Sequence, residues 1–312
     1  MSTQNPSLLE TVVADGRPPL QLTAFALFFS GCFAFFLSIR REFLPHDIAF
    51  LGMTPDQLCA IAECRVVAFM FHDRVAFAGV LVAIAILYFW LTAVPLADGA
   101  TWAWWTVAIS GGIGFLSFLS YLGHGYLDTW HGVGSVALVP IFLAGLLRSR
   151  VLLRSAARAR AALVLRGLQG RQRLGRLALL ATGLGMGLAG ATILTVGMTG
   201  VFVPQDLEFM RVSIAELDAA NPRLVPLIAH DRSGFGGGLL SAGLVVAACA
   251  LFANPSRSLW QALAGAGAAG FGAAIGVHPA IGYTDWFHLA PAIAGGLLFV
   301  IGLALTAPGQ EG

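Results

Sequence analysis

Eight apolar stretches, each of about 20 residues, constrain this 312-residue chain more than any other feature. A stretch of about 20 apolar residues is what an α-helix needs to cross the hydrocarbon core of a bilayer. Charged residues make up only 11% of the chain, whereas soluble domains contain about a quarter. The pattern excludes an ordinary soluble domain and predicts an all-α integral membrane protein. The predicted spans are residues 20–39, 73–96, 103–122, 131–147, 177–201, 233–253, 259–276 and 286–306.

The uneven distribution of arginine predicts how these spans are oriented. Nine of the eighteen basic residues lie between Arg148 and Arg176, and no acidic residue occurs between Asp128 and Asp206. Basic segments next to spans stay on the cytoplasmic side. We therefore expect a bacterial-type inner membrane protein in a lipid bilayer, with both termini cytoplasmic and no cleaved signal peptide. The basic segment suits an amphipathic helix on anionic lipid and does not favour a nucleic-acid partner.

One motif occurs twice in the chain. The pattern His-Asp-Arg-x-x-Phe-x-Gly begins at His72 and again at His230, an offset of 158 residues. An internal duplication of this size predicts two related halves of four spans each. Because four is an even number, the halves share one orientation and are expected to be parallel-repeat four-helix bundles. Two further pairs of segments match at nearly the same offset, residues 45–50 with 204–209 and residues 125–131 with 282–288.

The duplication also predicts the domain organisation. Capping boxes at residues 54–57 and 213–216 predict a short helix in the long first outer loop of each half. The expected order is a cytoplasmic tail (1–19), a first four-helix repeat (20–147), a basic cytoplasmic linker (148–176), a second four-helix repeat (177–306) and a short tail (307–312).

Each half places histidine and aspartate at the outer ends of its second and fourth spans. Asp128 precedes His131 by three residues, and positions i and i+3 share one face of a helix. Asp285 and His288 have the same spacing. Because the second and fourth helices of a small bundle can face each other, the sequence predicts one His/Asp cluster per half. The first cluster is His72, Asp73, Asp128 and His131, and the second is His230, Asp231, Asp285 and His288.

Two metal chemistries suit such clusters. Imidazole and carboxylate can bind iron, zinc or manganese directly. Alternatively, the histidines are axial haem ligands, the aspartates accept their N–H groups, and Arg74 and Arg232 pair with the haem propionates. A purely structural alternative is that aspartate and arginine form an ion pair that caps a span, while the histidines hydrogen-bond across helices. His124 and His278 lie nearby, but they align between the halves only after a shift of two to four residues.

This layout resembles haem A synthase, a family of two fused four-helix bundles with histidines near the outer ends of alternate spans. The resemblance implies that one half holds a haem b cofactor and the other the substrate haem. A cysteine pair in the first outer loop, Cys59 and Cys64, is a further similarity, and its spacing leaves a disulfide, a redox pair or free thiols open. The family's glutamate before the first histidine is missing, because Ala68 and Phe69 occupy that region. The histidines that correspond are His72, His131, His230 and His288.

We therefore expect a haem- or metal-binding redox protein, acting as a haem-dependent membrane oxidoreductase with a redox partner. Two alternatives are a non-haem metal-dependent enzyme acting on a lipid or amphiphile, and a proton- or metal-coupled transporter or assembly factor. The expected catalytic residues are His72, Asp73, Asp128 and His131, and the expected metal ligands are His72, His131, His230 and His288. The expected cofactor-binding residues are Arg74, His230, Asp231, Arg232, Asp285 and His288.

Overall fold

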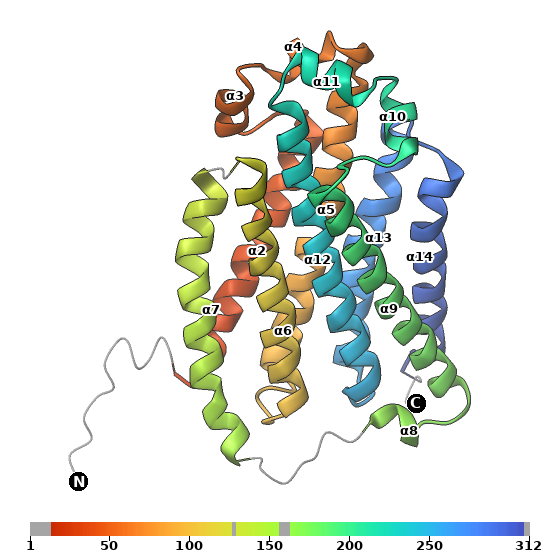
Figure 1. Cartoon of the computed structure of the whole chain (residues 1–312). Coiled ribbons are helices and arrows are strands. Elements are labelled where there is room, and N and C mark those ends of the chain that lie inside the picture. Colours follow the sequence, from red (N-terminus) through yellow and green to blue (C-terminus); the bar gives the residue numbers. More distant parts are fainter. Residues whose placement is uncertain (1–13, 127–128, 156–162, 309–312) are drawn as a thin grey trace, which may run out of the picture.

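The computed structural model describes residues 14–126, 129–155 and 163–308 and contains long helices that lie side by side (Figure 1). Every regular element in these ranges is a helix, and eight helices there are long and apolar enough to cross a membrane. This confirms the predicted all-α, multi-pass membrane protein in a lipid bilayer. The eight are α2 (Arg17–Arg40), α5 (Arg65–Ala93), α6 (Thr101–Ser117), α7 (Thr129–Ser155), α9 (Gly170–Met198), α12 (Leu224–Phe252), α13 (Arg257–Ile281) and α14 (Trp286–Thr306).

Short helices cover one end of the bundle, at the top of Figure 1, which we call the capped end. The predicted capping boxes are confirmed: the Thr54 hydroxyl accepts the Gln57 N–H, and the Ser213 hydroxyl accepts the Glu216 N–H. Each box starts a short helix, as its sequence predicts. The elements of the capped end are α3 (Pro45–Leu51), α4 (Pro55–Cys59), α10 (Pro204–Met210) and α11 (Ile214–Ala220), with the 3₁₀ helix η1 (Ala62–Cys64). The 3₁₀ helix η2 (Phe118–His124) extends α6, and α8 (Val164–Gly167) lies at the opposite end.

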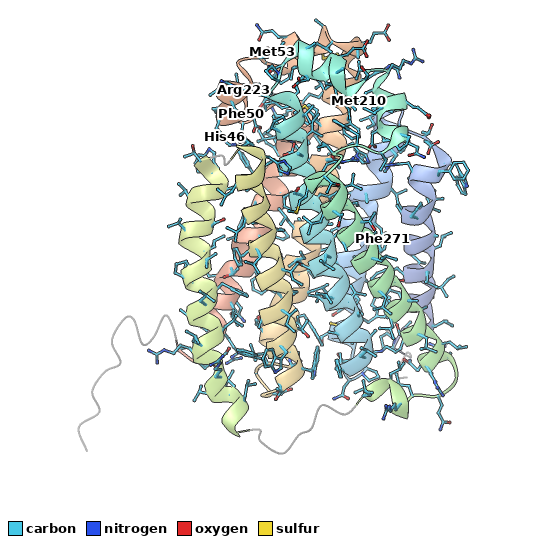
Figure 2. All side chains as sticks on the ribbon, viewed as in Figure 1. His46, Phe50, Met53, Met210, Arg223 and Phe271 are labelled. Atoms are coloured by element: carbon cyan, nitrogen blue, oxygen red, sulfur yellow. A yellow bond between two sulfur atoms is a disulfide. The ribbon has the colours of Figure 1, made fainter. Side chains whose placement is uncertain are left out.

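Two loop regions far apart in the sequence are bonded to each other at the capped end. Arg223 donates to the carbonyl oxygen of Phe50 at 2.6 Å, and its guanidinium lies 5.5 Å from the centre of the Phe50 ring. Asn221 donates to the carbonyl oxygen of Leu51 at 2.8 Å. Figure 2 shows Phe50, Met53 and Arg223 gathered on one side of this end. The capped end is therefore a joint structure of both halves.

Helices α5 and α12 form the centre of the bundle. In each of these two helices, 67% of an apolar 18-residue stretch is buried inside the protein. In the other six long helices the corresponding share is at most 28%. Helix α5 packs against α2, α12 and α13, whereas α12 packs against α5, α6 and α9. The third long helix of each half thus lies against the second long helix of the other half. The packing interleaves the two halves, which the sequence did not predict.

The two central helices begin earlier than predicted. Helix α5 begins at Arg65 and α12 at Leu224, whereas the hydropathy pattern suggested residues 73 and 233. Charged motifs of this kind predict a boundary with water, but partners from other elements neutralise them inside the bundle. His72 and His230 consequently lie about two turns into their helices. Likewise, α7 continues to residue 155 and α9 begins at residue 170, so both ends of the basic segment are helical.

Glycines at seven-residue spacing bring the backbones of α9 and α12 into direct contact. A Cβ atom on Gly190 would lie 2.7 Å from the carbonyl oxygen of Gly236, and one on Gly236 would lie 2.9 Å from that of Gly190. Gly183 and Gly243 form the same reciprocal contact one heptad away. Small residues allow this close approach between membrane helices. The glycine run at residues 234–238 therefore serves the close packing of α12 against its neighbours.

Gly190→Leu is expected to lower the melting temperature of the detergent-purified protein. The leucine side chain must push α12 away from α9, and overpacking of this kind costs about 1–3 kcal/mol. Gly185→Leu on the same helix is the matched control, because nothing lies within 4 Å of a Cβ atom at Gly185. Equal melting temperatures for the two variants would contradict a structural role for the close contact.

Candidate metal centre formed by three histidines

Arg74 of the first motif binds one aspartate from each half of the chain. Its Nε donates to Asp231 at 2.8 Å, and its Nη1 donates to Asp47 at 2.8 Å. Asp231 belongs to the second motif, whereas Asp47 lies in α3 of the first half. The guanidinium also lies 5.1 Å from the centre of the Phe43 ring. Arg74 therefore ties α5 both to its own outer loop and to α12.

Arg232 of the second motif makes the corresponding bonds. It donates to Asp206 of α10 at 2.6 Å and to Asp73 of α5 at 3.2 Å. The sequence-based alternative of an Asp–Arg ion pair is therefore present. Each arginine forms one pair within its own half and one pair that joins the two halves. We call the six residues the crossed ion network: Asp47, Asp73, Arg74, Asp206, Asp231 and Arg232.

A tyrosine adds a hydrogen bond to each aspartate of the short helices. Tyr126 donates to Asp47 at 2.6 Å, and Tyr283 donates to Asp206 at 2.9 Å. Burial opposes ionisation of Asp47, but the charge of Arg74 and the Tyr126 hydroxyl outweigh it and hold the pKa of this carboxyl below its usual value. Burial and the Asp206 carboxylate raise the pKa of Tyr283 well above its usual range. Tyr283 therefore stays protonated and donates.

Asp47→Asn is expected to change how stability depends on acidity. A carboxyl whose pKa is lowered by folding contributes stability in full above its unfolded pKa of about 3.9 and loses it as the pH falls through the folded pKa. The difference in unfolding free energy between the wild type and Asp47→Asn should therefore be constant above about pH 4 and shrink below it. Unfolding in detergent across this range measures the difference. A difference that does not vary with pH would contradict the ion pair.

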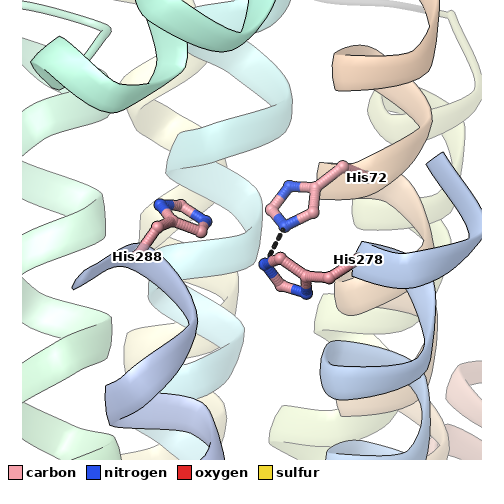
Figure 3. A group of neighbouring side chains, drawn as sticks. All are labelled: His72, His278 and His288. Atoms are coloured by element: carbon pink, nitrogen blue, oxygen red, sulfur yellow. Dashed lines mark hydrogen bonds between the residues drawn. The ribbon is translucent and has the colours of Figure 1, made fainter. Parts of the chain in front are cut away.

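Three histidines converge below the capped end (Figure 3). His72 comes from α5, His278 from α13 and His288 from α14. One nitrogen from each ring lies within 4.8 Å of the others. The Nε2 atoms of His72 and His278 are 3.1 Å apart, and the His288 ring centre lies 5.4 Å and 5.3 Å from those of His72 and His278. His72 and His278 are buried, and His288 is half-buried.

The neighbours of His72 and His278 determine which ring nitrogen carries the hydrogen atom. His72 Nδ1 lies 3.0 Å from the Asp73 carboxylate, which also pairs with Arg232. His278 Nδ1 lies 2.7 Å from the carbonyl oxygen of Ala274. A carboxylate and a carbonyl oxygen only accept, so both Nδ1 atoms are N–H donors. Both Nε2 atoms therefore carry lone pairs, and these face each other.

Two lone pairs at 3.1 Å repel each other unless a cation lies between them. The cation can be a shared proton or a metal ion. Zinc binds imidazole nitrogen at about 2.0–2.1 Å, so two nitrogens on a tetrahedral ion are about 3.3 Å apart. The spacing is close to this value, and His288 supplies a third nitrogen. Acceptors that fix Nδ1–H, as Asp73 and Ala274 do, are the usual outer partners of metal-binding histidines.

The structure groups the predicted histidines differently from the sequence analysis. His72 lies with His278 and His288 of the second half, whereas His131 lies beside His230, with ring centres 5.1 Å apart. Both groups therefore combine residues from the two halves. For His72 the physical reason is the interleaving, because α13 lies against α5.

The other predicted site residues have varied positions. His230 Nδ1 lies 3.1 Å from Asp231, as His72 Nδ1 lies beside Asp73. Asp285 is the N-cap residue of α14 and accepts the backbone N–H of His288. Asp128 lies outside the described residues. Arg74 and Arg232 are each engaged by two aspartates.

The sequence pattern does not favour His278, because this residue aligns with His124 only after a shift. Its importance follows from the packing of α13 against α5, which no local pattern in the sequence reveals. The first outer loop contains a disulfide between Cys59 and Cys64, one of the three states that the spacing left open.

Comparison of the chain with protein-family models, with curated proteins and with solved structures found no match. Its function is therefore inferred from the chemistry of the residues described above.

Proposed function

We propose that the protein is a membrane metalloprotein in which His72, His278 and His288 bind one zinc or iron ion. The observation that carries this proposal is the pair of Nε2 lone pairs that face each other at 3.1 Å. Imidazole suits zinc and iron, whereas manganese prefers oxygen ligands. When bound, such an ion supplies Lewis-acid chemistry or, in the case of iron, electron transfer. Asp73 and the Ala274 carbonyl keep the hydrogen atoms on Nδ1 and so leave Nε2 free to bind.

We infer that the capped end faces the outside of a bacterial-type inner membrane. The described arginines of the basic segment lie near the end of α7, in α8 and near the start of α9, at the opposite end of the bundle. Basic segments of this kind remain in the cytoplasm. The metal centre then lies near the outer leaflet, and both termini lie inside the cell.

The paired interactions support an origin by duplication. Arg74 and Arg232 bind equivalent aspartates, and Tyr126 and Tyr283 donate to equivalent carboxylates. We infer two parallel repeats of four spans, related by an axis that passes between α5 and α12. The group of His72, His278 and His288, which we call the histidine trio, breaks this symmetry, because no histidine precedes His278 by the repeat offset of about 158 residues. The two halves therefore contribute unequally to the histidine trio.

A second candidate is haem b bound by His131 and His230, two of the four histidines that correspond to those of haem A synthase, although the resemblance itself implies a pair within one half. The specific observation in its favour is that these two rings come from different helices, α7 and α12, and approach to 5.1 Å. Axial ligation needs two histidines on facing helices, and these two rings would have to move apart to admit the iron. The guanidinium groups of Arg74 and Arg232 are occupied by aspartates, so propionates would need other partners.

Elemental analysis and an absorption spectrum of the same purified sample test both candidates. We expect one zinc or iron per chain in the wild type, and none in a His72→Ala/His278→Ala/His288→Ala variant. The His131→Ala/His230→Ala variant is the matched control and should keep the metal. A Soret band that this control loses would favour the haem candidate. Protein that contains neither metal nor haem after reconstitution would contradict the proposal. The cation between the Nε2 atoms of His72 and His278 would then be a shared proton.

A further inference from the structure

A groove of about 770 Å³ opens between α2, α5 and α13 near the capped end. Its volume falls within the range of small-molecule sites, about 300–1,000 Å³. Phe35 and Ile39 of α2 and Val75 of α5 form apolar walls, and Gly272 and Gly276 make the α13 side smooth. A Cβ atom at either glycine would meet nothing within 4 Å. The part of the groove that these residues line therefore suits an apolar chain.

The end of the groove nearest the short helices is polar. It is lined by Arg41, Glu63 and Arg65 and by both cysteines of the Cys59–Cys64 disulfide. The Nε atom of Arg65 is buried and makes no hydrogen bond, and the nearest charge is the Glu63 carboxylate, 4.0 Å away. A buried donor of this kind needs a partner. The groove as a whole matches an amphiphile with an apolar tail and a small head that accepts hydrogen bonds.

The chain between the two cysteines has an unusual backbone. Ala62, Glu63 and Cys64 have φ values of 51°, 52° and 62°, a left-handed region that residues with a side chain rarely adopt. Three such residues in a row store strain, and backbone strain of this kind gathers at functional sites. A structural disulfide does not require this conformation. Opening the bond lets the three residues relax, which favours a disulfide that exchanges with a dithiol.

We propose that the groove binds a membrane quinone and that the dithiol form of Cys59 and Cys64 reduces it. The two thiols give up two electrons and two protons. The protons and electrons pass to the two carbonyl oxygens of the ring, the S–S bond forms, and the quinol leaves. A phospholipid has a similar shape but no group that accepts electrons from sulfur. The inference goes beyond the metal centre, because the histidine trio takes no part in the step.

Glycine substitutions provide a way to fill the groove without moving a helix. Gly276→Leu extends its side chain into the groove, because the space around this position is open. Gly185→Leu on α9 is the matched control, since that glycine is equally open but does not line the groove. Cys32 is an exposed free cysteine on α2 and is replaced by serine in every sample.

The experiment follows oxidation of the dithiol under anaerobic conditions. The purified full-length protein is reduced, freed of reductant and mixed with decylubiquinone, whose fully substituted ring does not add thiols. We expect one quinol per chain and loss of the Cys59 and Cys64 thiols to alkylation, with the same rate after treatment with a chelator. Cys59→Ser should abolish quinol formation. Gly276→Leu should slow it about tenfold by occupying the ligand's volume, and Gly185→Leu should leave it unchanged.

Two results would overturn the inference. Thiols that persist in the presence of the quinone would show that the pair does not reduce it. Gly276→Leu protein that reacts as fast as the Gly185→Leu protein would show that the reaction takes place outside the groove. Loss of metal from the trio changes neither readout, so failure of the metal proposal is distinguishable from failure of this one.

Discussion

Replacing Arg232 by methionine is expected to lower the free energy of unfolding by about 3–5 kcal/mol, the usual cost of leaving a buried charge without its partner. Asp73 and Asp206 both lose their guanidinium, and their side chains are 2% and 0% exposed. The carbonyl oxygen of Val201 also loses a donor at 2.6 Å. Unfolding followed by circular dichroism in mixed micelles with increasing denaturing detergent measures the change.

Arg257→Met is the control for this substitution. Arg257 is an exposed residue in the first turn of α13, and exposed positions of this kind change stability by only about 0.5 kcal/mol. Adding Asp73→Asn and Asp206→Asn to Arg232→Met should recover part of the loss, because the unpaired charges are removed as well. An Arg232→Met protein as stable as the Arg257→Met protein would show that water, not the crossed ion network, solvates these aspartates.

Asp73→Asn is expected to weaken zinc binding about 10–100-fold, the usual effect of removing an outer partner of a metal-binding histidine. The asparagine amide can donate to His72 Nδ1, which moves the hydrogen atom to Nε2, where it points at the metal position. Competition with a fluorescent zinc chelator at constant pH measures the affinity. The variant also loses a partner of Arg232, so binding and stability must be measured on the same samples.

Asp231→Asn separates these two effects. Asp231 bears the same relation to Arg74 and His230 as Asp73 bears to Arg232 and His72. Its replacement therefore removes an equivalent ion pair without touching the trio. We expect similar losses of stability in the two variants, and loss of zinc affinity only in Asp73→Asn. Equal zinc affinities would contradict the orienting role of Asp73.

Features of the fold that depend on local sequence could be predicted. Hydropathy identified all eight spans, and the capping boxes identified α4 and α11, because both signals act over a few neighbouring residues. The starts of α5 and α12 could not be predicted. Their charged motifs look like span ends until Asp47 and Asp206, distant in sequence, are known to neutralise them.

The candidate site was only partly predictable for a related reason. The repeated motif identified His72 and Asp73 as residues that carry chemistry, and the structure gives them direct contact. The symmetry of the repeat suggested His131 as the partner of His72, but the contacts come from His278 and His288. Which helix lies beside α5 depends on how the halves interleave, and an alignment of the halves with each other does not contain this information.

The crossed ion network also constrains how the chain is assembled in the cell. Asp73 is synthesised 159 residues before Arg232, its arginine partner. The first four spans therefore enter the bilayer while this carboxyl, about two turns inside α5, still lacks its counter-charge, and an unpaired charge within a membrane span is costly. The first half must be held by the insertion machinery, or remain loosely packed, until α12 arrives. Two separately made halves should accordingly accumulate only when they are produced together.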